Sequence, residues 1–269
     1  MQIVFVGGGN MATALIGGML RQGFRAADIG VIEPDAAKRE ELQRSFGIAT
    51  HADVPQAATI DVLLLAVKPQ QMKQVAQAWA AAAAGALVIS IAAGIRTESL
   101  SDWLGGHSRI VRVMPNTPAL VQAGVSGLYA AAAVGAEDRD AAQRILAAVG
   151  ETVWVDDEPM IDAITAISGS GPAYVFYFIE SLTEAGKALG FSAEQARQLA
   201  YATFAGSIKL AQQSDDDAAT LRAKVTSKGG TTERALATME AGGVKAAIID
   251  GARAACRRGK ELGDEFGKQ

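Results

Sequence analysis

The sequence predicts an α/β protein in which a doubly wound, mostly parallel sheet domain is followed by an all-α C-terminal domain. Two observations lead to this fold class. Up to about residue 155, short apolar runs rich in β-branched residues alternate with stretches of helical apolar spacing. Beyond that point the strand pattern disappears, and helical stretches separated by Gly or by Ser and Asp continue. We therefore expect two domains, residues 1–155 and residues 156–269.

The composition indicates an ordinary globular protein with a small ligand. Of the 269 residues 49% are hydrophobic and 20% are charged, and the net charge of −4 comes without any Lys/Arg cluster. This pattern gives no footprint for nucleic acid or for an anionic membrane surface. The first residues lack the basic lead of a signal peptide, no run reaches membrane-spanning length, and the single Cys256 requires no oxidising compartment. We expect a cytoplasmic protein.

The first strand and the turn after it predict a dinucleotide site. Gln2 to Val6 is a short apolar run of the kind found in a central parallel strand, and Thr13 to Leu20 has helical spacing. Between them, residues 7–12 read Gly-Gly-Gly-Asn-Met-Ala, a G-x-G-x-x-A pattern in the strand-to-helix position of a Rossmann-like fold. Its glycines let a pyrophosphate approach the backbone, and Ala12 lets the helix pack closely on the strand.

The second strand, residues 29–32, leaves the choice of cofactor open. Glu33 follows it at the spacing where an acid commonly binds the adenosine ribose hydroxyls, which favours NAD. Asp35 is expected to cap the next helix. Lys38 and Arg39, one turn into that helix, are either a solvated face or a site for the 2′-phosphate of NADP.

Two further strands, residues 61–67 and 87–91, should end at the crevice where open α/β sheets bind ligands, and a third strand, residues 109–113, leads into a rigid loop. The segments at their carboxyl ends are 66–69 (Ala-Val-Lys-Pro), 92–94 (Ala-Ala-Gly) and 114–118 (Met-Pro-Asn-Thr-Pro). In the last of these, Asn116 and Thr117 are candidates for hydrogen bonds to a nicotinamide or a ribose. Strand-like runs at 125–130 and 152–155, with a helix between them, close this domain.

The second domain is expected to consist of helices alone. Ser192 and Gln195 have the spacing of a capping box, which predicts one helix start. The expected helices cover residues 160–167, 172–189, 192–213, 215–225, 232–240 and 244–266.

Two helix starts in this domain are candidate ligand sites. In residues 168–174 (Ser-Gly-Ser-Gly-Pro-Ala-Tyr), small residues precede a helix, which suits either a ligand at its amino end or a tight turn that opens a core helix. In residues 226–233 (Thr-Ser-Lys-Gly-Gly-Thr-Thr-Glu), the glycine N–H groups and the threonine hydroxyls could receive a carboxylate. The alternative for this second stretch is a plain loop with a threonine N-cap.

These motifs, in this order, resemble pyrroline-5-carboxylate reductase. The resemblance rests on residues 7–12, 66–69, 90–94, 114–118, 168–174 and 227–232 and so covers nearly the whole chain. It implies the last step of proline biosynthesis, in which NADPH or NADH reduces the cyclic imine 1-pyrroline-5-carboxylate to L-proline. It also implies that the helical domain forms interlocked dimers, often arranged in a larger ring, in which the partner completes each active site.

The resemblance also implies roles for individual residues. Gly229, Gly230 and Thr231 would hold the substrate carboxylate, and Thr232 would lie close to the ring nitrogen as the catalytic residue. The substrate-binding set is Ser168, Gly229, Gly230, Thr231 and Thr232. The cofactor-binding set is Gly7, Gly9, Asn10, Met11, Ala12, Glu33, Ala66, Val67, Lys68, Pro69, Ala92, Ala93, Gly94 and Asn116.

Two residues depart from the family pattern. Glu33 stands where relatives often have a small polar residue near the 2′-phosphate, which leaves the preference between NADPH and NADH open. Lys228 replaces a proline that is usual in the glycine loop, which adds charge attraction for a carboxylate and loosens the turn.

The chemistry needs no strong acid or metal, because a protonated imine already accepts hydride readily. His51 and His107, the only two histidines, lie outside the motifs, which argues against a Ser-His triad or a zinc cluster. The rival enzyme class, β-hydroxyacid dehydrogenases, uses a lysine with an asparagine further along its helix. Asn10 and Asn116 are the only asparagines, so Lys187 has no such companion. Another imine reductase and a non-catalytic NAD(P)-binding protein remain as alternatives.

Overall fold

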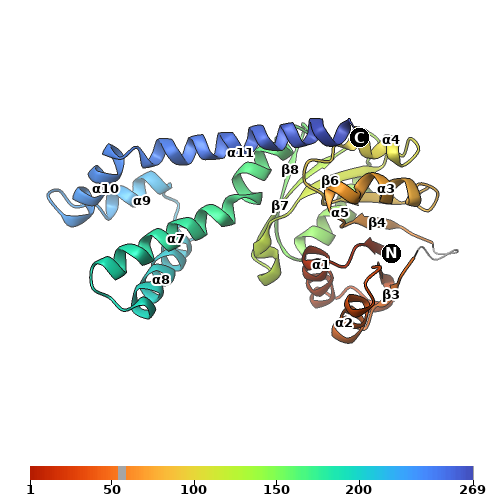
Figure 1. The fold of residues 1–269 in the computed structure, drawn as a ribbon, viewed down its shortest axis with the longest axis horizontal. Coiled ribbons are helices and arrows are strands. Elements are labelled where there is room, and N and C mark those ends of the chain that lie inside the picture. The colour runs from red at the N-terminus through yellow and green to blue at the C-terminus, as the bar shows by residue number, and fades with distance from the viewer. Residues whose placement is uncertain (54–58, 269) are drawn as a thin grey trace. The chain divides into compact units, whose positions relative to one another are not determined.

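The computed structural model describes residues 1–53 and 59–268, and within them eight strands form one sheet. The strand order is β3-β2-β1-β4-β5-β6-β7-β8, and every neighbouring pair is parallel except β6 and β7. The predicted doubly wound, mostly parallel sheet is therefore confirmed (Figure 1). The strands are β1 (Ile3–Val6), β2 (Ile29–Ile32), β3 (Ala49–His51), β4 (Val62–Leu65), β5 (Leu87–Ser90), β6 (Ile110–Met114), β7 (Gly124–Ala130) and β8 (Gly150–Val155).

Helices cover both faces of this sheet because both faces are apolar. Side chains alternate along a strand, so Ile3 and Phe5 of β1 enter one core cluster while Val4 and Val6 enter the other. The first cluster is completed by α1 (Asn10–Arg21), α2 (Ala36–Phe46) and α5 (Ala136–Ala147). The second is completed by α3 (Pro69–Trp79), α4 (Thr97–Trp103) and the end of α11 (Val244–Gly267).

The predicted strands of this sheet all form, but one strand was missed. β3 has the sequence Ala-Thr-His, pairs only with β2 at the sheet edge and has no fully buried residue. A short polar edge strand lacks the apolar run that reveals the central ones. Asp35 caps α2 as predicted, since its carboxylate accepts hydrogen bonds from the backbone N–H groups of Ala37 and Lys38.

Contacts divide the chain into two compact units: Met1–Ser170 with Ala254–Gln269, and Gly171–Arg253. This division differs from the expected boundary near Asp156. The reason is that α6 (Met160–Ile164) packs on β6 and β7, and the end of α11 buries Phe266 in the second core cluster. Residues 54–58 and 269 of the two expected domains lie outside the described residues.

Gly171–Arg253 contains helices and no strand, as predicted for this region. Pairing of α7 with α8 dominates it, and the predicted capping box is present, because Ser192 accepts from Gln195 N–H and the Gln195 side chain accepts from Ser192 N–H. Its helices are α7 (Gly171–Ala188), α8 (Ala193–Gln212), α9 (Ala218–Lys224), α10 (Thr231–Ala241) and the first part of α11.

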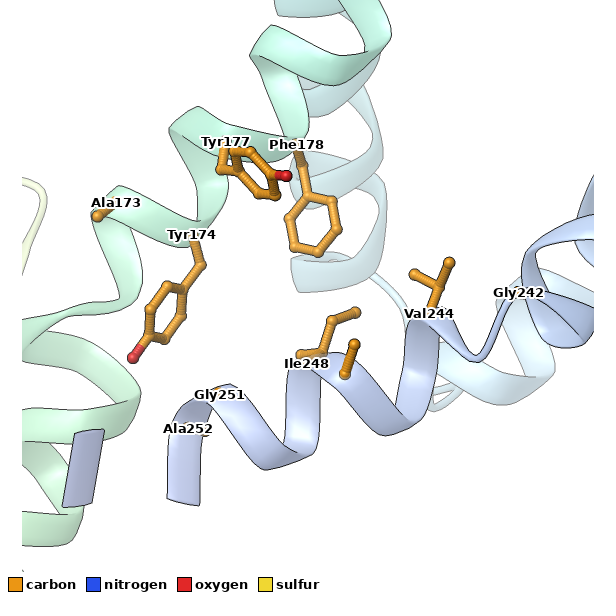
Figure 2. Close-up of a pocket in the computed structure, with 10 residues that line it drawn as sticks. Ala173, Tyr174, Tyr177, Phe178, Gly242, Val244, Ile248, Gly251 and Ala252 are labelled. Carbon is orange, nitrogen blue, oxygen red and sulfur yellow. The ribbon is translucent and has the colours of Figure 1, made fainter. Parts of the chain in front are cut away.

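This helical unit leaves much of its apolar surface exposed. More than half of the surface is exposed for Phe176, Tyr177, Leu189, Tyr201, Ile208 and Leu210. A cavity of about 410 Å³ opens between α7 and the start of α11, where Tyr174, Tyr177 and Phe178 face Val244 and Ile248 (Figure 2). No helix among the described residues combines the length and the apolar character needed to cross a bilayer.

Candidate functional site

The turn between β1 and α1 has the geometry of a dinucleotide-binding loop. Gly7 adopts φ +101°, and a Cβ there would lie 2.7 Å from the carbonyl oxygen of Ala66, so only glycine fits. Gly9 caps α1 with open space where its Cβ would be, and Ala12 is buried against the sheet. The open amino end of α1 therefore offers free backbone N–H groups to an anion.

Glu33 is part of this loop. Its side chain is buried, with 7% of the residue exposed, and its carboxylate accepts hydrogen bonds from Gly8 N–H at 2.9 Å and from Asp35 N–H at 3.0 Å. Arg39 lies at the same end of β2, where its Nη1 donates to the carbonyl oxygens of Glu33 and Pro34, both at 2.8 Å. A carboxylate suited to ribose hydroxyls and a cation suited to a 2′-phosphate thus stand side by side.

The carboxyl ends of β4 and β5 lie at the same edge of the sheet, because the two strands are neighbours that pair in parallel. Ala66 follows β4 directly beside the glycine turn, and its N–H donates to Val6 O at 2.8 Å. Lys68 caps α3, and Pro69 takes its first position. Gly94 has φ +74° and packs against the end of α11. A Cβ at this position would lie 3.2 Å from atoms of Leu262 and Phe266. The positive φ and the close packing both favour glycine at this position. A cofactor role for residues 92–94 stays a prediction.

Asn116 ties the loop after β6 to Ser168. Its Oδ1 accepts from Val125 N–H at 2.9 Å, and its Nδ2 donates to the Ser168 carbonyl oxygen at 3.1 Å. Asn116 is 8% exposed. Half of the hydrogen-bonding positions of its side-chain amide are therefore used within the protein, where they connect the loop after β6 to the turn that contains Ser168, and a contact to nicotinamide stays a prediction.

The second candidate loop lies in the helical unit, at the start of α10. Gly229 has φ +73°, and its N–H donates to Oε2 of Glu233 at 2.6 Å, while Gly230 N–H donates to Ser227 O at 3.0 Å. Both glycine N–H groups named as carboxylate donors are thus already bonded. The donors left at this helix start are the N–H groups of Thr231, Thr232 and Glu233, which by geometry have no acceptor inside the helix.

α9 fixes the chain just before this loop. Asp217 caps α9 by accepting from Thr220 N–H at 2.8 Å, and this backbone hydrogen bond lowers the pKa of the Asp217 carboxyl below its ordinary value. Since a lowered pKa keeps the carboxylate ionised, the cap is present above that ordinary value and is lost only as the pH falls through the lowered one. The helix start is therefore stable across neutral pH.

The site residues fall into both compact units. Ser168 and the cofactor-binding set belong to the unit that contains the sheet, and residues 229–232 belong to the helical unit. Sequence reasoning missed Glu233, although its place three residues after the Gly230 cap is typical of an acid that bonds backward. Among the described residues, no group of three or more His, Cys, Asp and Glu side chains is arranged to hold a metal ion.

Comparison with known proteins identifies the family. Residues 158–262 match the family described as pyrroline-5-carboxylate reductase dimerisation, and residues 2–94 match the one described as NADP oxidoreductase, coenzyme F420-dependent. A pyrroline-5-carboxylate reductase of Pseudomonas aeruginosa is 45% identical over 269 residues, which cover 99% of this chain and 98% of the relative. The chain belongs to the pyrroline-5-carboxylate reductase family.

Solved structures of pyrroline-5-carboxylate reductases share the whole fold. The one from Coxiella burnetii has a TM-score of 0.92 at 40% identity and covers 97% of this chain and 98% of its own. The Plasmodium falciparum enzyme, solved with NADP bound, has a TM-score of 0.85 at 28% identity, with 98% of each chain covered. The resemblance inferred from the motifs is thus confirmed over nearly the whole length.

Glu233 provides a test of the substrate loop. Its carboxylate lies on the backbone that we expect to receive the substrate carboxylate, so Glu233→Gln should lower the KM for the imine roughly threefold to tenfold by removing the repulsion. The KM for the nucleotide should not change, and the gain should shrink at high salt. Steady-state kinetics at two ionic strengths measure both. Glu240→Gln, at the other end of α10, is the matched control, and an unchanged imine KM in Glu233→Gln would contradict this placement of the substrate.

Proposed function

We propose that this protein reduces 1-pyrroline-5-carboxylate to L-proline with NADPH or NADH, the last step of proline biosynthesis. The observation that carries the proposal is the 45% identity to a pyrroline-5-carboxylate reductase over 99% of the chain. The glycine turn at the end of β1 supports it, because that turn suits a dinucleotide, and residues 158–262 match the pyrroline-5-carboxylate reductase dimerisation family.

Residues 7–12 would hold the cofactor pyrophosphate, and residues 66–69 and 92–94 its nicotinamide half. The fit is supported by the open space at Gly9 and by the close approach of Gly7 to Ala66. The NADP bound in the P. falciparum relative and the match to an NADP oxidoreductase family support a nicotinamide cofactor here. When bound, the reduced nicotinamide supplies a hydride.

In the reaction the hydride would join C5 of the C=N bond, and a proton would join the ring nitrogen. Since a protonated imine is already electrophilic, the chain's task is to orient the substrate and to exclude water. We assign the substrate carboxylate to the start of α10, where Thr231 and Thr232 supply N–H groups. The Thr232 hydroxyl would hold the ring nitrogen, and Ser168 stays a predicted substrate-binding residue.

The assay that tests this function compares nucleotides and substrate. We expect oxidation of NADPH or NADH, followed at 340 nm, only when 1-pyrroline-5-carboxylate is present, with proline formed in equal amount. Cofactor binding without turnover would instead support a non-catalytic NAD(P)-binding protein. Turnover only with a hydroxy acid and oxidised cofactor would support the dehydrogenase alternative.

Glu33 and Arg39 are expected to set the cofactor preference in opposite directions. A buried carboxylate repels a 2′-phosphate, so Glu33→Ser should raise kcat/KM for NADPH relative to NADH by about tenfold. Arg39→Ala should shift the same ratio toward NADH, because it removes the cation beside Glu33. Paired kinetics with the two nucleotides give the ratio, and Arg44→Ala near the end of α2 is the control. An unchanged ratio in both variants would place the adenosine ribose elsewhere.

We further propose that the chain is at least a homodimer, formed through residues 156–269 and assembled into a larger ring of dimers, and that it works in the cytoplasm. The match of residues 158–262 to a dimerisation family supports the dimer. So does the exposure of large apolar side chains on α7 and α8, which a monomer would leave in water.

Phe176 tests this interface. It is 64% exposed in the single chain, and an aromatic side chain buried between subunits is typically worth about 2 kcal/mol or more. Phe176→Asp should therefore raise the dimer dissociation constant by roughly thirtyfold or more, as measured by analytical ultracentrifugation. Val121→Asp, at an exposed apolar residue of the sheet unit, should leave association unchanged. Equal association in both variants would remove α7 from the interface.

A further inference from the structure

Arg112 is a charged residue in a core position of the sheet. Along β6, Val111 and Val113 enter one core cluster while Ile110 enters the other, and Arg112 shares the face of Ile110. Only 3% of its side chain is exposed. A buried guanidinium is costly unless its donors are satisfied, so its partners indicate what it does.

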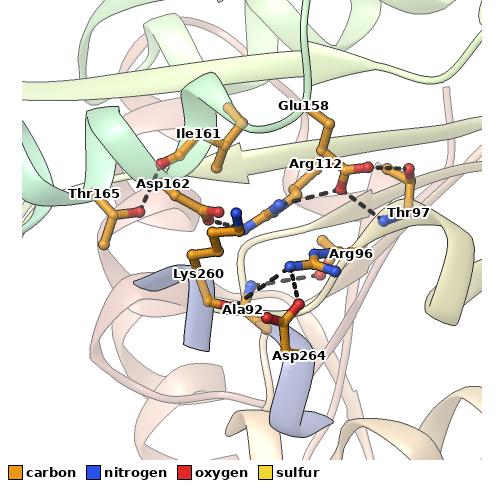
Figure 3. A network of polar contacts seen from close by, with 11 residues as sticks. Ala92, Arg96, Thr97, Arg112, Glu158, Ile161, Asp162, Thr165, Lys260 and Asp264 are labelled. Carbon is orange, nitrogen blue, oxygen red and sulfur yellow. Dashed lines mark hydrogen bonds and ion pairs between the residues drawn. The ribbon is translucent and has the colours of Figure 1, made fainter. Parts of the chain in front are cut away.

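Both partners of Arg112 come from the segment that follows β8. Nη1 donates to Glu158 Oε1 at 3.2 Å and Nη2 to Asp162 Oδ1 at 2.9 Å (Figure 3). Glu158 also accepts from the backbone N–H of Thr97 at 2.8 Å and from its hydroxyl at 2.7 Å. Arg112 thus connects the segment at the start of α6 to strand β6, and Glu158 connects it to Thr97, the first residue of α4.

The same face of the same strand holds the far end of that segment. Met114 lies two residues after Arg112 and so on the same side of β6, and Asn116 follows in the loop after the strand. A Cβ on Gly169 would lie 2.7 Å from Met114 Cε, and Asn116 donates to the carbonyl oxygen of Ser168. The segment 158–169 is therefore held at both of its ends. Arg112 contacts its start, and Met114 and Asn116 contact its end.

The second of these contacts falls within a π-helical turn, η3 (Thr165–Gly169). It continues α6 directly, and the Ser168 hydroxyl donates back to Ile164 O at 3.2 Å. Such turns are rare and occur frequently at functional sites. The direction of the Ser168 carbonyl and hydroxyl therefore depends on how α6 is rotated.

We propose that Arg112 is a positioning residue, which sets the rotation of α6 through Asp162 and thereby places Ser168 for the imine. This rests on the proposed function. A planar guanidinium that binds two carboxylates fixes an angle, which apolar packing does less strictly. Arg112 Nε is buried with no acceptor in the described part of the chain, and a buried donor without a partner lowers stability. A stabilising role alone therefore does not account for Arg112 and its two carboxylate partners.

The test removes the Asp162 contact in two ways. Asp162→Asn keeps an oxygen for Arg112 Nη2, whereas Asp162→Ala removes it. We expect Asp162→Ala to lower kcat/KM for the imine about tenfold and Asp162→Asn to stay within about threefold of the wild type. The Kd for NADPH, measured by fluorescence titration, should be unchanged in both.

Asp264→Ala is the matched control. It breaks the ion pair of Asp264 with Arg96, 2.6 Å long in the same unit, and neither partner bonds to the segment 158–169. It should leave imine kinetics unchanged. If Asp162→Ala does not fold, Arg112→Lys replaces it, because a lysine keeps the charge but loses the two-pronged geometry.

Three outcomes would overturn the proposal. One is a folded Asp162→Ala or Arg112→Lys with wild-type imine kinetics, another is an equal loss of NADPH affinity, and the third is an Asp162→Asn variant as impaired as Asp162→Ala. Failure of the proposed function is distinguishable, because the wild-type protein itself would then show no imine-dependent oxidation of NADPH.

Discussion

The burial of a parallel sheet on both faces is the constraint that the rest of this structure depends on. Every residue of β1, β4 and β5 is buried, so helices must lie on both sides. Side chains of these strands have no solvent-facing direction in which to present chemistry. A ligand can therefore reach this sheet at the strand ends, where Gly9 leaves open space at the start of α1. A fold that leaves main chain as its chief recognition element suits anionic ligands.

In the helical unit, by contrast, most residues are not buried within the single chain. α7, α9 and α10 contain no fully buried residue in the single chain, although α7 carries Phe176, Tyr177 and Phe178. Such helices cannot be stable through their own core, and a partner subunit is the natural cover. Because the loop at residues 229–232 belongs to this unit, substrate binding and subunit association would depend on the same helices. A variant that loosens the dimer should then affect catalysis without touching the nucleotide turn.

The sequence predicted most of the fold because the signals of its central elements are local. Apolar runs located every central strand, Asp35 revealed one helix start, and the spacing of Ser192 and Gln195 revealed another. The contacts that organise the site are not local. Arg112 lies in a predicted strand, yet its carboxylate partners follow 46 and 50 residues later, and no spacing rule connects them. The tie between Asn116 and Ser168 spans 52 residues for the same reason. The motifs named candidate segments, but only the structure shows which backbone donors within them are already bonded.

Two of those bonded backbone donors each have a glutamate carboxylate as their acceptor. The Glu33 carboxylate accepts from Gly8 N–H in the turn after β1, and the Glu233 carboxylate accepts from Gly229 N–H in the loop before α10. Each places a fixed negative charge beside a helix start that attracts anions. Attraction from free N–H groups and repulsion from a nearby carboxylate together favour an anion of limited charge at one defined place. We infer that selectivity here arises less from specific side-chain contacts than from which backbone donors these two acids leave free. On this reasoning, exchanging either acid for a neutral residue would broaden the range of anions accepted before it weakened the fold, because neither residue belongs to the two core clusters.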